Sequence, residues 1–333
     1  MRYKQYTRII LALAVLFQGC ERQFDIDISA TEKLFLQCFP GQRDTTIIQL
    51  YKTNPLGGKV DFSSILDEAD LSFIVNGVEC NPQKAQQKFG SVFPGCWFVP
   101  GNVSSGSKVE ITAKYGSVDP VGATTIIPAP VPEFSYILSD DAVSISLKDD
   151  NSANAYYGLA VICERTIDKG DTREVWTVNM DPLDDGGKIA GMPYNRTYMD
   201  IEFDGRTVGG KGKDNVRVWS DEVSKDGKVD LAMRIGLDEG KLPIYEMGDS
   251  VSMRYKVRVY RFSRELFLYA ESLFLSSYDV NTYSSGIISA PVYGSWGKYG
   301  ITPPVLSFTN VSNGMGILAG WTMRETDWIS QDY

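Results

Sequence analysis

Hydrophobic residues alternate with polar ones over short stretches of the chain, which is the period of a β-strand with one buried face. In Met253–Tyr260 three basic residues alternate with apolar ones. This pattern predicts a strand whose Arg254, Lys256 and Arg258 side chains face water and whose other side chains face a core. Further runs rich in β-branched, aromatic or alternating residues predict strands over Lys33–Cys38, Thr45–Leu50, Leu71–Val75, Cys96–Val99, Val109–Tyr115, Ser135–Leu138, Val143–Leu147, Tyr156–Glu164, Val175–Asn179, Val216–Trp219, Lys228–Ile235, Ser250–Arg261 and Ile287–Ala290.

Turn residues separate these runs. Asn76-Gly77 and Asp226-Gly227 are pairs typical of tight hairpin turns. Short strands at this spacing favour a β-sandwich. One segment departs from the trend, since Ser263–Tyr278 places apolar residues at helical spacing behind Ser263, which suits the N-cap position. We therefore expect a mainly β fold that carries one amphipathic helix.

A proline-rich segment, Ile127–Pro132, is the clearest boundary along the chain. Alternate prolines fix φ and hold the preceding residues extended, so we predict a stiff linker over residues 128–133. The linker separates an immunoglobulin-like β-sandwich, residues 31–127, from a larger C-terminal β-rich domain, residues 134–333. We expect the second domain to be a sandwich or a barrel-like sheet with the helix packed on it.

The N-terminus has the anatomy of an export signal. Three basic residues precede the apolar run Ile9–Phe17, which is shorter than the about 20 residues that a transmembrane helix needs. Gly19-Cys20 closes the run. We predict a lipoprotein signal peptide over residues 1–19, acylation of Cys20 and a polar tether over residues 20–30, so that acyl chains hold the protein on a lipid bilayer. The alternative is an ordinary secretory signal with an incidental cysteine.

Composition excludes several classes of function. The formal net charge of −9 disfavours binding to the phosphates of nucleic acids. Histidine is absent, so no Ser-His-Asp triad, Cys-His dyad or histidine-containing metal site can form. We expect no enzyme activity, no cofactor, no bound metal ion and no nucleic acid partner. The enzymatic alternative is a glycosidase with two carboxylates; Glu164, in an apolar strand, is the acid most suited to burial, and an ion pair with an arginine is the other reading of it.

Cysteine usage leaves one pairing to consider. Five cysteines are present, and acylation of Cys20 leaves four. Cys80 and Cys96 flank a predicted hairpin, which makes them the candidate disulfide. The alternative is that they are small buried hydrophobic residues.

Two clusters near the C-terminus are candidates for binding a ligand or a partner. Aromatic residues crowd a stretch rich in Gly and Ser, and aromatic faces with polar rims suit carbohydrate or peptide ligands. They are Tyr283, Tyr293, Trp296 and Tyr299. Asn310 and Asn313 belong to a following Asn/Gly motif that suits a ligand-facing loop. The alternatives are packing at the domain edge for the aromatic residues and a tight entry turn to the last strand for the Asn/Gly motif.

The order of these features resembles a known family. The matching stretches are Glu21–Asp27 (ERQFDID), Tyr156–Leu159 (YYGL), Trp219–Leu231 (WSDEVSKDGKVDL) and Pro303–Trp321 (PPVLSFTNVSNGMGILAGW), together with the proline-rich junction. They resemble Bacteroidota lipoproteins that share domain of unknown function 4249. The resemblance covers nearly all of the chain after Cys20. It implies an outer-membrane lipoprotein, often accompanied by a TonB-dependent transporter, and it implies no particular activity.

From these features we expect a non-enzymatic accessory of a TonB-dependent nutrient transporter. The protein would be anchored by lipid in the outer membrane and exposed at the cell surface, since Glu21 and Asp25 resemble signals for that location. It would bind an unknown small ligand, which is a peptide, a glycan or a metal complex. The alternative is a structural or adhesive lipoprotein of the cell envelope.

Overall fold

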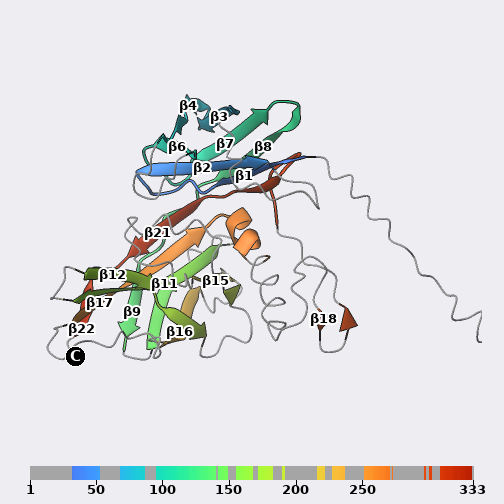
Figure 1. Ribbon diagram of the computed structural model, residues 1–333. Helices are drawn as coiled ribbons and strands as arrows, with labels where there is room; N and C mark the ends of the chain where they lie inside the picture. The colour runs from blue at the N-terminus through green and yellow to red at the C-terminus, as the bar shows by residue number, and fades with distance from the viewer. Residues whose placement is uncertain are drawn as a thin grey trace, which may run out of the picture. The chain divides into compact units, whose positions relative to one another are not determined.

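The computed structural model describes residues 32–52, 68–86, 95–139, 142–148, 155–167, 172–182, 190–191, 216–221, 227–236, 251–270, 272, 296–297, 300–301 and 308–331. Within these ranges the chain forms strands and one helix (Figure 1), so the prediction of a mainly β fold with a single helix is confirmed. All described residues apart from Glu32 belong to one compact unit.

Two sheets form a first β-sandwich. One has the strand order β20-β1-β2-β6-β5 and the other β4-β3-β7-β8. The strands are β1 (Leu34–Cys38), β2 (Thr45–Lys52), β3 (Asp70–Val75), β4 (Val78–Cys80), β5 (Gln83–Lys84), β6 (Trp97–Pro100), β7 (Lys108–Tyr115), β8 (Val118–Ile126) and β20 (Met315–Leu318). Alternate apolar side chains of both sheets meet in one core, among them Leu36, Ile48, Phe73 and Ile111. The sequence patterns that predicted β1, β2, β3, β6 and β7 are therefore what supplies the core between the two sheets.

The edge of the first sheet is completed by a strand from the far end of the chain. β20 pairs in parallel with β1, so that Phe35 lies opposite Met315 and Cys38 opposite Leu318. Val311 and Leu318 belong to the same core as β1. A parallel pair needs a long connection between its strands, so no local sequence pattern marks it. The predicted domain limits stay a prediction. The pairing of β20 with β1 shows that a segment near the C-terminus contributes to the first sandwich.

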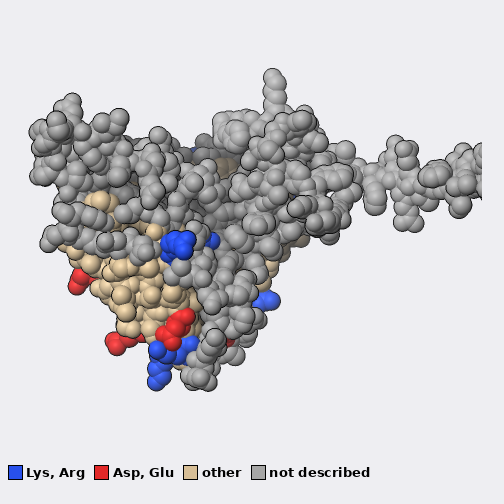
Figure 2. Space-filling view, turned by 90° about the horizontal axis from the view of Figure 1, so that it is seen from below, with Lys and Arg blue, Asp and Glu red and all other residues tan. Residues whose placement is uncertain are grey.

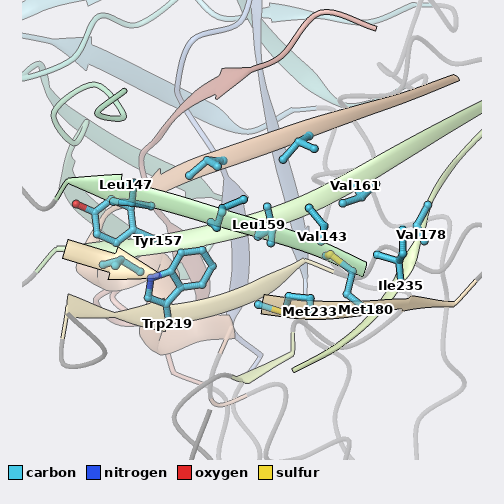
Figure 3. Close-up of a cluster of buried hydrophobic side chains, with 14 of the residues drawn as sticks. Val143, Leu147, Tyr157, Leu159, Val161, Val178, Met180, Trp219, Met233 and Ile235 are labelled. Carbon is cyan, nitrogen blue, oxygen red and sulfur yellow. The ribbon is translucent and has the colours of Figure 1, made fainter. Parts of the chain in front are cut away.

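A second pair of sheets follows the proline-rich segment. One has the order β13-β16-β10-β9 and the other β14-β15-β11-β17-β21, with β12 paired to β11 and β22 to β17. The strands are β9 (Phe134–Leu138), β10 (Ala142–Lys148), β11 (Tyr156–Ile167), β12 (Thr172–Thr177), β13 (Asn179–Pro182), β14 (Ala190–Gly191), β15 (Arg217–Ser220), β16 (Lys228–Gly236), β17 (Val251–Phe262), β21 (Trp321–Glu325) and β22 (Ile329–Gln331). Figure 3 shows Val143, Leu159, Trp219 and Met233, from four different strands, pointing into the shared core.

The helix begins where the sequence predicts. Residues 264–270 are helical, and the Ser263 Oγ accepts a hydrogen bond from the backbone N–H of Leu266 at 3.4 Å. This is the N-cap contact, which satisfies a backbone donor that the first turn leaves without an intrahelical partner. Leu266 and Ala270 are buried in a third core cluster with Ile317. The last residues of the predicted helix, 273–278, lie outside the described residues.

The proline-rich segment is anchored at both of its ends. Ile127 is buried in the core of the first sandwich, and Val131 is buried in the core of the second. Between these residues, the Pro128 carbonyl accepts a hydrogen bond from the Ser105 hydroxyl at 2.7 Å, and the Ala129 carbonyl accepts one from Thr322 of β21 at 2.8 Å. The segment thus has no regular secondary structure, yet its extended backbone is held in place by both halves of the chain.

Candidate ligand-binding site

Three basic side chains on one face of β17 lie against carboxylates of the two neighbouring strands and an indole ring. Arg254 lies directly opposite Glu164 of β11, and Arg258 lies opposite Glu325 of β21. Lys256 stands between the two arginines on the same face of the strand. We call these five side chains, together with that of Trp328, the basic row.

The exposure of the basic row corrects one expectation from the sequence. The apolar residues Tyr255, Val257 and Val259 are buried, as the alternation predicts. The basic residues were expected to face water, which is wrong for two of them, because the side chains of Lys256 and Arg258 are only 16 % and 10 % exposed. Their charges are retained at low exposure because Glu325 lies against both of them.

Glu325 is the centre of the buried end of the row. Its Oε1 lies 2.6 Å from the Lys256 Nζ, and its Oε2 lies 2.7 Å from the Arg258 Nη2. Partial burial alone would raise the pKa of this carboxyl, but the bonds and charges of Lys256 and Arg258 outweigh it and hold the pKa below its ordinary value. Glu325 is therefore ionised at neutral pH.

This pKa shift makes a testable prediction about stability. A carboxyl whose pKa is lowered by folding stabilises the native state above its ordinary pKa of 4.5 and loses that contribution as the pH falls through the folded value. We expect Glu325→Gln to lower the melting temperature at pH 7, and the gap between wild type and variant to shrink below pH 4.5. Thermal melts between pH 3 and pH 7 measure this gap.

The matched control for this prediction is Glu110→Gln. Glu110 also pairs with a lysine, Lys108, at 2.6 Å, but both side chains are exposed, so the substitution is expected to have little effect at any pH. A gap between wild type and Glu325→Gln that stays constant from pH 7 to pH 3 would contradict the assigned role of Glu325.

Arg254 forms the exposed end of the row. Its Nε donates to the Glu164 Oε1 at 2.5 Å, and the Glu164 side chain is only 4 % exposed, whereas that of Arg254 is 40 % exposed. The guanidinium carbon lies 4.6 Å from the centre of the Trp328 ring, and the Lys256 Nζ lies 4.9 Å from the same centre. Both cations thus contact the negative face of one indole. The burial of Glu164 and its ion pair with an arginine agree with the sequence-based reading of that residue.

The row combines cationic side chains with an aromatic face, and such groups can bind an anion. Its three basic side chains lie against two carboxylates, in a chain whose net charge is −9. Among the described residues no three His, Cys, Asp or Glu side chains gather in a way that could hold a metal ion. On the face shown in Figure 2 the described surface is mostly neutral, with a few acidic and basic side chains that lie next to each other at the lower end of the view.

Three residues of the predicted aromatic cluster, Tyr283, Tyr293 and Tyr299, lie outside the described residues. The predicted strand Ile287–Ala290 and the predicted lipid attachment residue Cys20 also lie outside them. Trp296 is part of β18 (Trp296–Gly297), which pairs with β19 (Gly300–Ile301) in a two-stranded hairpin. The roles of these residues in binding stay predictions.

Asn310 and Asn313 make contacts that hold β20 in place. The Asn310 side chain bonds the backbone of Leu318 twice, accepting from its N–H at 3.0 Å and donating to its carbonyl at 2.8 Å. Asn313 has φ +58° and donates to the Pro120 carbonyl at 3.3 Å. These contacts favour the structural alternative, in which the Asn/Gly motif forms the turn into the last strands, and a ligand role for either residue stays a prediction.

Cys80 belongs to one sheet of the first sandwich, and Cys96 immediately precedes a strand of the other. Cys80 ends β4 and is partly exposed, whereas Cys96 is buried just before β6. No disulfide joins the described cysteines in the structure, so the pairing stays a prediction. Cys38 lies in the core of the first sandwich, where burial raises the pKa of its thiol and keeps it protonated.

The sequence did not point to Trp328 or to Arg254 as a binding group. Trp328 follows β21 in a polar stretch without periodicity, and the alternation on β17 marks all three of its basic residues alike. Only the register of β17 against β11 singles out Arg254, because it places this residue opposite the buried Glu164. None of the described residues belongs to a helix that is long and apolar enough to cross a bilayer.

Comparison with known proteins identifies the family. The profile of a family described as "Domain of unknown function (DUF4249)" matches residues 21–327. The matched part contains Glu164, Arg254 and Glu325 and ends one residue before Trp328. No curated protein matches the chain. Because the match covers most of the sequence, the chain belongs to the DUF4249 family.

Proposed function

We propose that the protein is a lipid-anchored accessory of a TonB-dependent nutrient transporter, placed at the outer surface of the outer membrane. It binds a small ligand, which is a peptide, a glycan or a metal complex, and presents it to the transporter. The observation that carries the proposal is the short apolar run closed by Gly19-Cys20, in front of a chain that belongs to the DUF4249 family. A tether to a membrane surface suits a protein that works beside a membrane transporter.

The lack of histidine and the ion pairs of the acids in the basic row support a role in binding rather than in catalysis. Histidine is absent from the whole chain. A carboxylate glycosidase needs one acid that stays protonated near neutral pH and a second carboxylate across a cleft. The acids of the basic row are unsuited to this task, because Glu164 and Glu325 are both held by cations and the pKa of Glu325 is lowered.

The anchor is tested by Cys20→Ala. Since the thioether forms on the thiol of this residue, we expect the variant to move from the membrane fraction to the soluble fraction and to lose incorporation of labelled palmitate. Cys80→Ala is the matched control and is expected to stay in the membrane, because Cys80 lies within the folded β-structure. Unchanged membrane retention of Cys20→Ala would refute the anchor.

The role in transport is tested by affinity purification. We expect tagged protein from mildly solubilised outer membranes to recover a TonB-dependent transporter in stoichiometric amount, identified by mass spectrometry. An unrelated lipoprotein with the same tag controls for nonspecific recovery. If the protein is recovered alone, the proposed role fails, and the structural or adhesive alternative gains weight.

A further inference from the structure

We propose that Arg254 is a binding site for a carboxylate group of the ligand, with Glu164 and Trp328 as the residues that position it. The inference rests on the proposed function, which it deepens by naming the chemical class of the ligand. The carboxylate belongs either to the C-terminus of a peptide or to a uronic acid of a glycan.

The hydrogen bonds of Arg254 leave one edge of its guanidinium open. The Nε donates to Glu164, and among the described contacts neither Nη group donates a hydrogen bond. A guanidinium carries five N–H donors in a rigid planar fork, so a partner at Nε leaves the end-on edge between the two Nη groups intact. This edge matches the two oxygens of a carboxylate, which accept two parallel, charge-assisted hydrogen bonds.

The guanidinium is held in place before any ligand arrives. Glu164 is almost fully buried, and the register of the antiparallel pair places it directly across from Arg254. Trp328 lies against the guanidinium with 4.6 Å between the guanidinium carbon and the ring centre. A free surface arginine loses considerable rotamer freedom when it binds an anion, whereas Arg254 has already lost much of it. This preorganisation distinguishes Arg254 from an ordinary exposed arginine.

The charge of the basic row favours an anion that carries a single charge. The Arg254 guanidinium is paired with the Glu164 carboxylate, and Lys256 and Arg258 share the Glu325 carboxylate. Arg254 thus already has one carboxylate at its Nε, while the Lys256 ammonium lies against the same Trp328 ring. A ligand carboxylate adds one negative charge next to Glu164, whereas a doubly charged phosphate would add two to a partly desolvated site.

The test compares matched ligands that differ only in the carboxylate. Nuclear magnetic resonance titrations of the purified full-length protein would use a short peptide with a free C-terminus against the same peptide with a C-terminal amide. A second arm would use a galacturonic acid oligomer against the neutral galactose oligomer. We expect one charged ligand to bind at least about tenfold more tightly than its neutral counterpart, with shifts in the Arg254 side-chain and Trp328 indole signals. The arm that binds identifies the source of the carboxylate.

Two substitutions test the residue itself. Arg254→Lys keeps the positive charge but loses the planar fork, so we expect it to weaken carboxylate binding by about tenfold or more, and Arg254→Gln by at least as much. Arg324→Gln is the matched control. Arg324 is similarly exposed and also lies 3.5 Å from a glutamate, but it is not in the basic row, so binding should be unchanged. Equal affinities of Arg254→Lys and wild type would overturn the assignment.

The wild-type comparison keeps the proposal testable if the variants fold poorly. Equal binding of the charged and neutral forms, or binding of neither charged form, would overturn it without any substitution. The outcome is also separable from that of the proposed function. Recovery of a transporter without carboxylate binding would leave the accessory role intact, and carboxylate binding without a transporter would leave only the ligand site.

Discussion

Gly316→Ala is expected to lower the free energy of unfolding by about 3–5 kcal/mol, or to prevent folding altogether. Gly316 has φ +104°, a conformation that costs an L-residue about 1–3 kcal/mol. An added Cβ would also overlap the Leu36 carbonyl oxygen on the neighbouring strand. Because Leu36 is buried in the core and β1 is paired on both of its edges, the backbone has no room to move away. The substitution thus separates β20 from β1.

A matched glycine isolates the effect of this overlap. Gly77 has φ +80°, and a Cβ added there meets no atom within 4 Å. Gly77→Ala therefore bears only the conformational cost, about 1 kcal/mol. Chemical denaturation of both variants measures the difference. If Gly316→Ala is no less stable than Gly77→Ala, then the close approach of β20 to β1 is not a feature of the folded protein.

Trp321→Ala is expected to cost about 3–5 kcal/mol of stability, since it empties a large buried volume. Trp321 is the first residue of β21, in the second pair of sheets, and is only 3 % exposed. Its Nε1 donates to the Phe39 carbonyl at 3.1 Å, and its ring fills the space beside Gly41, where an added Cβ would lie 2.7 Å from the ring. Phe39 and Gly41 lie just after the end of β1, so the Trp321 side chain connects the end of β1 to β21, which pairs with β17.

Substitution by phenylalanine separates packing from hydrogen bonding. Trp321→Phe keeps an aromatic ring but loses the bond to Phe39. At Trp219, which is also fully buried, the indole Nε1 has no acceptor within the described structure. We expect Trp321→Phe to cost about 1 kcal/mol more than Trp219→Phe, which is the net value of one hydrogen bond. Denaturation curves decide this, and an equal or larger loss at Trp219 would contradict the assigned bond.

Local features of the fold were predictable because neighbouring residues determine them. Asn76 and Gly77 have φ values of +52° and +80°, the left-handed pair that a two-residue hairpin turn requires. Ser263 caps the helix because its side chain reaches a donor only three residues away. The strand β17 follows from its alternation of apolar and basic residues. In each case the physical cause lies within about one turn of helix or one strand.

β8 is one of the strands that escaped prediction, and its reason is local. β8, Val118–Ile126, begins only three residues after β7 ends, and Pro120 and Gly122 interrupt its pattern. Both residues are poor strand formers, so the segment lacks the β-branched run that marks β7. Tertiary contacts override this weakness, because Val121 is buried in the core of the first sandwich and Ser312 donates to the Gly122 carbonyl at 2.9 Å.

In the candidate site, too, one residue could be recognised from the sequence, whereas its partners depend on pairing between distant strands. Glu164 could be singled out from the sequence, since a lone acid in an apolar strand needs a cation if it is buried. Which cation it meets could not be read, because Arg254 lies 90 residues later and its partner depends on the register of two long strands. Trp328 and Glu325 reach the row only because β21 and β22 both pair with the free edge of β17.

By itself the sequence determined the mainly β fold and the absence of histidine chemistry, and it predicted a lipid-anchored N-terminus, because periodicity, composition and signal anatomy are properties of the chain alone. Only the tertiary structure decided what covers each face of each strand. A strand's alternation separates its two faces, but whether a polar face meets water or a second charged strand depends on pairing between distant segments. For this reason the three basic residues of β17 read alike in the sequence, while in the structure two of them are enclosed around Glu325 and Arg254 alone presents its charge outward.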